Sequence, residues 1–475
     1  MPNEVNGAVV SQACGIDCDS QGGVWRMDDF ELAHGIAREV ADAGGRVYYV
    51  GGFVRDRLLG RENKDVDIEV HGVETEALEQ ILAQFGAVAT YGASFGIYGI
   101  RGHGLDIAVP RREDATGKGG HRDFRVHTDP FLGTRKAAMR RDLTMNALYE
   151  DVLTGQVIDH FGGQEDMARG VIRHVNDASF TEDPLRVLRA AEFAARFGMH
   201  VDASTVELCS SMDLSKLPRE RVLEEVKKAL LKSPTPSVFF EELRTMNQLD
   251  HWFPELLALV DVPQNPKYHP EGDAWAHTMQ VIDSAATLRS QAQHGFAFML
   301  AALCHDLGKA VTTWERDGRI VSYGHERKGV PIAAAFLNRV VASPKVKAYV
   351  LNMVELHMSP NAFAGQGAKQ KAYNKLFDAS CCAGDLLLLA KADRMGRVPD
   401  DVYRETELEL RARLQAYENV MARPHVQGSD LLEAGIEPGP LMGETLRYAH
   451  KLQLAGVQKE DALRQCLSFY RKVTK

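Results

Sequence analysis

The stretch that decides the fold is RVYYVGGFVRDRLLGRENKDVDIEV, residues 46–70. Its first five residues, 46–50, are rich in valine and tyrosine and predict a β-strand. Two glycines, Gly51 and Gly52, follow this strand, and a helix is predicted at 53–59. Because glycine has no Cβ, the turn would let the backbone approach a phosphate closely, and the helix behind it would direct N–H groups at the anion.

Asp65 and Asp67 accompany a second predicted strand, at 66–70. Residues two apart on a strand face the same side, so both carboxylates project from one face. Paired oxygen ligands of this kind suit Mg²⁺, and two such ions would activate an attacking hydroxyl and stabilise a leaving pyrophosphate. Asp106, on a strand predicted at 105–109, is a candidate third carboxylate.

A D-x-D sequence alone more often represents two solvated aspartates on an edge strand. The Gly-Gly-x-x-Arg-Asp element ahead of it, which includes Arg55, favours the metal site instead. The chain has no G-x-x-x-x-G-K-[ST] sequence, and the run Gly92, Gly96 and Gly99 does not fit G-x-G-x-x-G. P-loop and Rossmann chemistry are therefore disfavoured.

Length and composition exclude other classes of protein. A chain of 475 residues with 45% apolar and 25% charged residues is globular and is expected to form roughly two to four units. Its net charge of −9 argues against nucleic-acid binding by bulk charge, although a local basic stripe remains open. The longest apolar run, 296–304, is about half the length of a membrane-spanning helix. No signal peptide is predicted, and the seven cysteines, Cys14 and Cys18 among them, do not indicate a disulfide scaffold, so we expect a cytoplasmic protein.

The pattern of predicted elements changes along the chain. Further helices at 28–43 and 78–85 and a strand at 98–100 complete a mixed α/β unit over the first 150 residues. The polar, basic and glycine-rich stretch 110–136 is predicted to be a mobile loop. From residue 180 to the end the pattern is helical, with no further sheet expected.

Several sequence motifs follow one another along the chain in the same order as the motifs of a known protein family. Residues 51–67 resemble the bacterial-type (class II) tRNA nucleotidyltransferases, the CCA-adding enzymes, and the related bacterial poly(A) polymerases. Three later segments resemble the next motifs of that family: RRDLTMNAL at 140–148, DHFGG at 159–163 and EDPLRVLR at 182–189. The resemblance covers roughly residues 46–475.

The resemblance implies an enzyme that adds CMP and AMP, from CTP and ATP, to the 3′ end of tRNA and releases pyrophosphate. It assigns catalysis with Mg²⁺ to Asp65, Asp67 and Asp106. It assigns nucleotide contacts to Gly52, Arg55, Arg140, Arg141, Asp142, Asn146, Asp183, Arg186 and Arg189.

Asp183 and Arg186 have a physical rationale as a template for the incoming base. Three residues apart on a predicted helix, their side chains share a face. A carboxylate accepts from an exocyclic amine and a guanidinium donates to ring nitrogens or carbonyls, so the pair would match cytosine and adenine. The alternative is an intrahelical ion pair worth a few tenths of a kcal/mol. Residues 217–228 are expected to buttress this helix.

A second set of candidate ligands lies downstream. Four residues match the order H…HD…D of HD-domain phosphohydrolases: His277, His305, Asp306 and Asp393. Imidazole and carboxylate ligands accept transition metals such as Ni²⁺, Mn²⁺ or Co²⁺, and such an ion would activate water to cleave a phosphate ester. Gly308 is expected to end the turn after the His-Asp pair. His325 and His357 occur where larger HD sites add ligands. Residues 268–281 resemble the HD region of CCA-adding enzymes in gamma-proteobacteria, which carry phosphatase and cyclic phosphodiesterase activities.

These observations predict an α+β protein with a nucleotidyltransferase head, containing a small mixed sheet, followed by helical domains. The predicted segments are a flexible extension (1–26), the head (27–165), a helical neck (166–260), an HD domain (261–400) and a helical tail that is a candidate for tRNA contact (401–475).

Other functions remain open on the sequence. A poly(A) polymerase would resemble the first half but typically ends in a basic tail and lacks an HD domain. CC-only or A-only addition would use the same template residues. Two alternatives belong to other classes of protein: an HD phosphohydrolase whose head is regulatory, and a non-catalytic RNA-binding module. No membrane partner is expected, and the oligomeric state is open.

Overall fold

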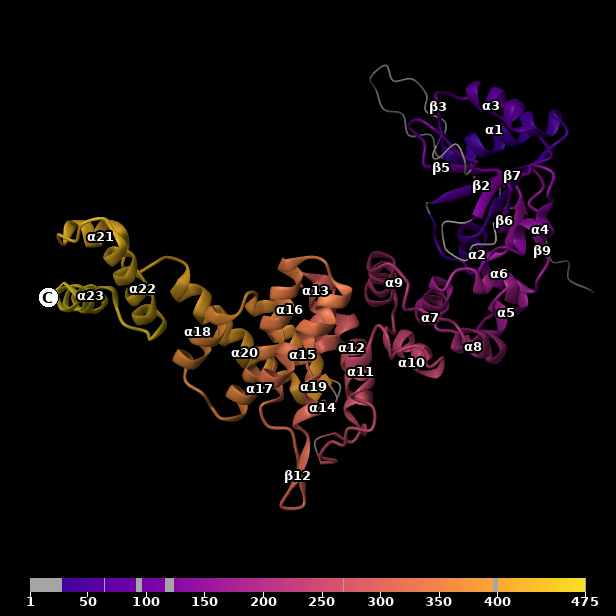
Figure 1. Ribbon diagram of the computed structural model, residues 1–475. Coiled ribbons are helices and arrows are strands. Elements are labelled where there is room, and N and C mark those ends of the chain that lie inside the picture. The colour runs from indigo at the N-terminus through magenta and orange to yellow at the C-terminus, as the bar shows by residue number, and fades with distance from the viewer. Residues whose placement is uncertain are drawn as a thin grey trace, which may run out of the picture. The chain divides into compact units, whose positions relative to one another are not determined.

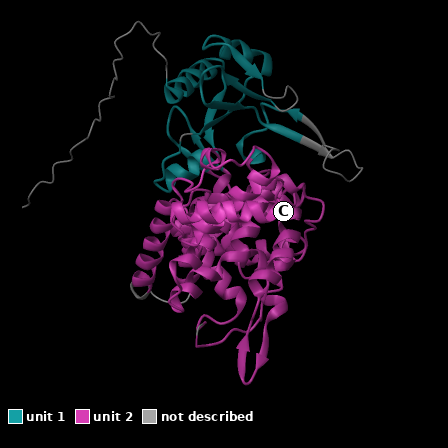
Figure 2. Ribbon diagram, turned by 90° about the vertical axis from the view of Figure 1, so that its left-hand side faces the viewer, with its two compact units in different colours: residues 1–137, 148–158 teal, residues 138–147, 159–475 magenta. Residues whose placement is uncertain are grey.

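Figure 1 shows the computed structural model of the chain. It describes residues 28–63, 65–90, 96–115, 124–267, 269–395 and 400–474. The predicted N-terminal extension, with Cys14 and Cys18, lies outside these ranges. The chain divides into two compact units, one of residues 1–137 and 148–158 and the other of residues 138–147 and 159–475 (Figure 2).

A mixed seven-stranded sheet forms the centre of the first unit. The strand order is β3-β4-β5-β2-β1-β8-β9. The bounds are β1 (Arg46–Val50), β2 (Val66–His71), β3 (Val88–Thr90), β4 (Ile97–Ile100), β5 (Leu105–Ala108), β8 (Leu148–Asp151) and β9 (Val157–Asp159). β2 pairs in parallel with β5, whereas β1 pairs antiparallel with both β2 and β8. The predicted mixed sheet is therefore confirmed.

The strands predicted for this sheet are present, but three short strands were missed. β3, β8 and β9 have only three or four residues each, which is too short for a periodic pattern. β8 is buried at every position, so it shows no alternation at all.

Helices of the first unit are α1 (Asp29–Asp42), α2 (Gly52–Leu58), α3 (Thr75–Ala83) and α4 (Thr134–Ala138), the last of which ends at the boundary with the second unit. α1 begins with a capping box, in which Asp28 accepts from the backbone N–H of Glu31 at 2.7 Å. Its buried residues recur every three or four positions, which explains why the helix was predictable.

The prediction of a mobile loop at 110–136 is wrong for much of that stretch. β6 (Arg111–Ala115) and β7 (Phe124–Thr128) form an antiparallel ladder, and α4 follows. The two strands are largely polar, so a search for apolar alternation does not find them. Residues 116–123 lie outside the described ranges.

The second unit is built mainly from helices. The helices nearer its N-terminus are η1 (Thr144–Asn146), α5 (Gly163–Arg169), α6 (Asp177–Thr181), α7 (Leu185–Phe197), α8 (Ala203–Ser210), α9 (Arg219–Lys232), α10 (Ser237–Thr245) and α11 (Pro254–Leu257). The later helices are α12 (Ala274–Leu288), α13 (Gly295–Cys304), α14 (Lys309–Thr312), α15 (His325–Val340), α16 (Pro344–Leu356), α17 (Met358–Gly365), α18 (Gln370–Ala379), α19 (Ala383–Met395), α20 (Asp400–Met421), α21 (Gly428–Glu433), α22 (Pro440–Leu454) and α23 (Lys459–Val473).

The expectation of no sheet after residue 180 is wrong at two places. β11 (His200–Val201) pairs in parallel with β10 (Val171–Ile172), and β12 (Trp314–Arg316) pairs with β13 (Arg319–Val321) as a hairpin. The hairpin turns at Asp317-Gly318, where φ is 51° and 71°. Asp-Gly is a common two-residue hairpin turn, so this signal was present in the sequence.

The longest apolar run of the sequence is a core helix. It forms α13, which is buried from Ala297 to Cys304 and lies within the helical body of the second unit (Figure 1). Within the described ranges, no helix combines the length and apolar character needed to cross a bilayer.

Candidate functional site

The predicted carboxylates of the head lie on adjacent parallel strands. Asp65 immediately precedes β2, Asp67 lies on β2, and Asp106 lies on β5 directly opposite Asp67. Residues paired in register face the same side of a sheet, and strands lie about 4.8 Å apart, so the carboxylates share one face. Asp65 and Asp106 are exposed and Asp67 is partly exposed. This donor set of carboxylate oxygens on an accessible face fits Mg²⁺.

A chain of hydrogen bonds connects the glycine turn to Asp65. Arg55 and Asp56 are buried as an ion pair, with Nε of Arg55 2.8 Å from Oδ1 of Asp56. Oδ2 of Asp56 accepts from Nδ2 of Asn63 at 2.8 Å, and Oδ1 of Asn63 accepts from the backbone N–H of Asp65 at 3.0 Å. These contacts fix the segment that carries Asp65.

The glycine turn also needs glycine for a conformational reason. Gly51 has φ 63° and ψ −124°, a conformation that L side chains rarely adopt. Gly52 begins α2, and a Cβ at this position would lie 3.5 Å from Nη2 of Arg55. The turn and the buried ion pair therefore form one local structure.

In the second unit, Asp142 is the centre of a buried polar cluster. Its Oδ1 accepts from the backbone N–H of Leu143 at 2.8 Å and from Nδ2 of Asn146 at 3.1 Å. Its Oδ2 accepts from Nε and Nη2 of Arg189, at 2.7 and 2.6 Å. Burial raises the pKa of Asp142, but the charge of Arg189 and these hydrogen bonds outweigh it, so the pKa is lowered. Asp142 thus holds Arg189 in place.

The interpretation of Asp183 and Arg186 as two positions on one helix is corrected. α7 begins at Leu185, and Asp183 precedes it, where its carboxylate accepts from the backbone N–H of Leu185 at 3.0 Å. Both Asp183 oxygens also accept from Arg221 of α9, at 3.2 and 2.7 Å. The 217–228 segment therefore supports the start of α7.

Arg186 lies in the first turn of α7 and donates to two backbone carbonyls. Nη1 donates to Ser179 at 2.7 Å, and Nη2 donates to Arg140 at 2.8 Å. Arg140 and the following Arg141 are partly exposed. The guanidinium of Arg186 is therefore fixed between segments 138–147 and 177–181, both within the second unit.

The candidate metal ligands of the second unit converge from separate helices. They are His277 on α12, His305 and Asp306 directly after α13, His325 on α15, His357 directly after α16, and Asp393 on α19. All are buried. Two groups have ligand atoms within 4.8 Å of one another, the first being His277, His305 and Asp393 and the second Asp306, His325 and His357.

Asp306 lies between the two groups. Its Oδ2 is 3.4 Å from Nε2 of His277 and 3.2 Å from Nε2 of His305. Its Oδ1 is 3.2 Å from Nε2 of His325 and 3.8 Å from Nε2 of His357. One oxygen therefore faces each group, as in a carboxylate that bridges two ions.

The other ring nitrogen of each histidine is anchored. Nδ1 of His305, His325 and His357 lies 2.7, 2.8 and 2.7 Å from the backbone carbonyls of Ala302, Ser322 and Val354. These contacts direct every Nε2 toward Asp306, which is the second-sphere arrangement typical of metal-binding histidines.

His277 is anchored by a carboxylate instead of a carbonyl. Nδ1 of His277 and Nδ1 of His269 both lie 2.8 Å from Oε1 of Glu271, whose side chain is buried. Burial raises the pKa of Glu271, but its hydrogen bonds to both histidines outweigh this and lower the pKa to about 2. A carboxylate, a histidine and a facing metal position form the triad that raises ligand basicity in many metal sites.

Gly308 has a different role from the one predicted. Its φ is −67°, which any residue adopts, so it is not needed for the turn itself. A Cβ at Gly308 would lie 2.1 Å from the carbonyl oxygen of His325 and 2.7 Å from the backbone nitrogen of Gly329. Glycine here lets α15 approach closely enough to place His325 beside Asp306.

The electrostatics of this cluster favour a cation. Burial raises the pKa of Asp306, but the charges of His305 and Lys309 outweigh it, so the pKa lies well below its ordinary value. Burial, with the nearby charges of His305 and His325, lowers the pKa of His357 to about 3, which keeps its imidazole neutral. Among the described residues, Nε2 of His305 and both oxygens of Asp306 make no well-directed hydrogen bond, although Nζ of Lys309 lies 2.6 Å from Oδ2 of Asp306. Buried polar atoms of this kind fit a metal site.

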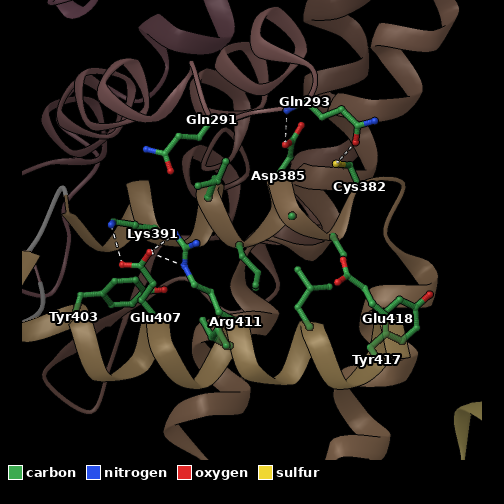
Figure 3. Close-up of a pocket in the computed structure, with 16 residues that line it drawn as sticks. Gln291, Gln293, Cys382, Asp385, Lys391, Tyr403, Glu407, Arg411, Tyr417 and Glu418 are labelled. Carbon is green, nitrogen blue, oxygen red and sulfur yellow. Dashed lines mark hydrogen bonds and ion pairs between the residues drawn. The ribbon is translucent and has the colours of Figure 1, made fainter. Parts of the chain in front are cut away.

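A separate cavity of about 540 Å³ lies beside α19 and α20 (Figure 3). Its charged groups interact with one another, since Glu407 forms ion pairs with Lys391 at 2.8 Å and Arg411 at 2.6 Å. Asp385 accepts from the backbone N–H of Gln293 at 2.8 Å. These interactions account for the polar lining without a substrate.

Comparison with known proteins identifies the family. The profile described as the poly A polymerase head domain matches residues 47–173, and the profile described as the probable RNA and SrmB-binding site of polymerase A matches residues 198–259. The Multifunctional CCA protein of Actinobacillus pleuropneumoniae serotype 5b (strain L20) is 36% identical over 407 residues, which are 82% of this chain and 94% of the relative. The chain belongs to the multifunctional CCA protein family. The Multifunctional CCA protein of Halorhodospira halophila (strain DSM 244 / SL1) is 35% identical and covers 87% of this chain and 98% of its own length.

Solved structures support the fold of this multifunctional CCA protein family member. The Bacillus stearothermophilus CCA-adding enzyme in complex with CTP has a TM-score of 0.62 at 22% identity, and covers 94% of this chain and 99% of its own. The Thermotoga maritima CCA-adding enzyme complexed with tRNA-CCA has a TM-score of 0.60 at 20% identity, and covers 92% and 94%. The α+β fold predicted from the sequence is thus confirmed.

Several side chains that position these sites were not identified from the sequence. Asp56 and Lys309 belong to motifs that were recognised, but neither had been given a role. Asn63 and Glu271 act through contacts between segments that no local pattern reveals, whereas Arg221 lies in the 217–228 segment that was expected to buttress the template helix. An aspartate next to a buried arginine, and a glutamate between two histidines, were the only signals available for Asp56 and Glu271.

Proposed function

We propose that this protein adds CMP and AMP, from CTP and ATP, to the 3′ end of tRNA. The observation that carries the proposal is the parallel register that sets Asp67 opposite Asp106, with Asp65 on the same face, in a chain of the multifunctional CCA protein family. The reaction joins the 3′ oxygen of the RNA to the α-phosphorus of the nucleotide and breaks the bond to the β-phosphate, releasing pyrophosphate.

Asp65, Asp67 and Asp106 would hold Mg²⁺, which supplies charge stabilisation to the phosphoryl group when bound. The protein's own contribution is positioning. Asp56 and Asn63 hold the segment that carries Asp65, so this carboxylate is presented with little freedom.

Asp183 and Arg186 are proposed to select the base. Arg221 fixes the carboxylate of Asp183, and two backbone carbonyls fix the guanidinium of Arg186. Groups held in this way can present a rigid pattern of acceptor and donor to the base edge. Asp142 and Arg189 support the same region, and the partly exposed Arg140 and Arg141 are candidates for phosphate contacts.

The test is nucleotide addition to tRNA transcripts that end before the first C, after CC, or with complete CCA, with each of the four labelled triphosphates alone and together. Full CCA addition predicts C incorporation on the first transcript and A incorporation on the second. A poly(A) polymerase would add many A residues to all three, and CC-only or A-only enzymes would act at one step each. Absence of addition with every transcript would refute the proposal.

We propose a second function, hydrolysis of phosphate esters in the HD region, supported by the buried convergence of its histidines on Asp306. Asp306 and the surrounding histidines, with Asp393, would hold a transition metal such as Ni²⁺, Mn²⁺ or Co²⁺, which would supply an activated water for the hydrolysis. Lys309, whose Nζ lies between Asp306 and Gln264, would add positive charge beside a bound phosphate. Hydrolysis adds water across the ester P–O bond and yields an alcohol and a phosphate.

The second function is tested by assaying p-nitrophenyl phosphate and nucleoside 2′,3′-cyclic phosphates with each metal. We expect His305→Ala to abolish this hydrolysis and to retain nucleotide addition, because these ligands belong to a separate cluster of side chains. Hydrolysis that is equal in His305→Ala and in the unmodified protein would refute the assignment.

The cytoplasmic location and the subdivision of the chain into neck, HD domain and tail are also proposals.

A further inference from the structure

The hairpin β12–β13 and the residues at its ends carry exposed aromatic side chains. Trp314 is 50% exposed and Tyr323 is 70% exposed, and they are the exposed aromatic residues in the described part of the second unit. The hairpin projects away from the helical body in both views (Figures 1 and 2). Large aromatic rings are normally buried, so their exposure on one short projection indicates a binding surface.

The tip of the hairpin carries two neighbouring arginines, while Glu315 and Asp317 bring the net charge of residues 314–321 to zero. Arg316 and Arg319 are paired directly across the two strands, and both are exposed. Like charges in this position destabilise a ribbon. The exposed Asp317, 3.7 Å from Arg316, and the Trp314 ring, whose centroid lies 6.0 Å from Cζ of Arg316, offset part of that repulsion. A phosphate beside the two guanidinium groups would relieve the remainder.

The base of the hairpin is connected to the candidate metal site. The hydroxyls of Thr313 and Ser322 are 2.7 Å apart and close the base. The carbonyl of Ser322 is 2.8 Å from Nδ1 of His325, a candidate metal ligand. Trp314 pairs with Val321, and the four residues from Val321 to His325 span at most about 14 Å. A few stacked nucleotides, at about 3.4 Å each, cover this length.

We propose that β12–β13 binds single-stranded RNA that ends in a phosphate, and that it presents this end to the HD region. Trp314 and Tyr323 stack on bases, and the Arg316–Arg319 pair contacts the phosphate backbone. Aromatic rings beside arginines are the usual means of binding single strands without sequence preference. The inference rests on the proposed phosphohydrolase function, because that function supplies the use for the bound phosphate.

Photo-crosslinking tests where the RNA binds. A single-stranded octanucleotide with 5-iodouridine near its end and a 3′-phosphate, which blocks nucleotide addition, is irradiated with the full-length protein, and the cross-linked peptides are identified by mass spectrometry. We expect cross-links at Trp314 or Tyr323. Cross-links confined to other parts of the chain would overturn the proposal.

Affinity provides the second measurement, by fluorescence anisotropy of the labelled octanucleotide. Trp314→Ala should raise Kd about five- to a hundredfold, the range found when an aromatic residue that stacks on a base is replaced by alanine. Trp314→Phe, which keeps an aromatic ring, should restore most of the affinity. The matched control is Leu408→Ala, which removes a similarly exposed apolar side chain from α20 and should leave Kd unchanged.

An unchanged Kd in Trp314→Ala would overturn the proposal. The proposal would also be overturned if Trp314→Ala lost self-association but kept its RNA affinity, because the hairpin would then bind a second copy of the protein. Neither binding measurement needs turnover. Failure of the HD region to hydrolyse p-nitrophenyl phosphate would therefore refute the phosphohydrolase function separately from RNA binding.

Discussion

Replacement of Gly308 by alanine should weaken metal binding in the HD region. The new Cβ would lie 2.1 Å from the carbonyl oxygen of His325, whereas real contacts of this kind are at least 3.0 Å, so the backbone of His325 must move by about 0.9 Å. Metal–ligand distances tolerate only about 0.2 Å. We therefore expect the affinity for Ni²⁺ to fall about ten- to a hundredfold, the range seen when groups that orient ligands are lost. The overpacking should also cost about 1–3 kcal/mol in the free energy of unfolding.

The assay is competition for Ni²⁺ with a chromophoric chelator, with the free energy of unfolding measured by urea denaturation. Gly384→Ala is the matched control, because Gly384 lies in α19 with open space around its Cβ position. The control should bind Ni²⁺ as the unmodified protein does and be slightly more stable. Equal Ni²⁺ affinity in Gly308→Ala and Gly384→Ala would show that the close approach of α15 does not determine the position of His325.

Four further predictions concern the other clusters. Asp67→Ala should abolish addition of both nucleotides to tRNA with an unchanged circular dichroism spectrum, and near-normal turnover would remove Asp67 from catalysis. Arg186→Ala should reduce the ratio of kcat/KM for CTP and ATP to kcat/KM for UTP and GTP by roughly ten- to a hundredfold, which is the contribution of a hydrogen bond to a charged group. An equal fall in kcat/KM for all four triphosphates would mean that Arg186 only positions α7. Glu271→Ala should weaken Ni²⁺ binding about tenfold or more because it releases Nδ1 of His277, and Glu271→Asp should retain part of the affinity. Equal Ni²⁺ affinity in Glu271→Ala and in the unmodified protein would exclude this role. Asp142→Asn should lower the free energy of unfolding by about 1–3 kcal/mol at neutral pH. Because the folded-state pKa of Asp142 is lowered, that difference should be largest above pH about 4 and shrink as the pH falls further, and a difference independent of pH would contradict the reasoning.

Local patterns predicted the parts of the fold that local interactions determine. The strands around the glycine turn, the helix α1, and the strand positions of Asp67 and Asp106 were predicted from periodicity and turn chemistry, whereas the capping box at Asp28 was not recognised. The β6–β7 ladder was missed because its residues are polar, and β12–β13 because short strands carry little periodicity. The Asp-Gly turn was the one cue to the second hairpin.

The sequence predicted which residues belong to the candidate sites but not the contacts that position them. The H…HD…D order gave the candidate ligands, yet the anchoring of His277 by Glu271 depends on a contact between residues whose pairing no motif specifies. Asp183 was expected within a helix, whereas α7 starts two residues later and Arg221 from α9 holds its carboxylate. Such contacts depend on how helices pack, and a single sequence does not contain that information in readable form.

The division of the chain into units has a consequence for dissecting the protein. The boundaries at 137/138, 147/148 and 158/159 mean that the polypeptide passes from one unit to the other three times. A fragment cut after residue 137 would lack β8, the neighbour of β1, and a fragment starting at 159 would lack Asp142, the partner of Arg189. No single cleavage yields two intact halves. Point substitutions such as Asp67→Ala and His305→Ala, rather than truncation at these boundaries, are therefore the suitable way to separate the two proposed activities.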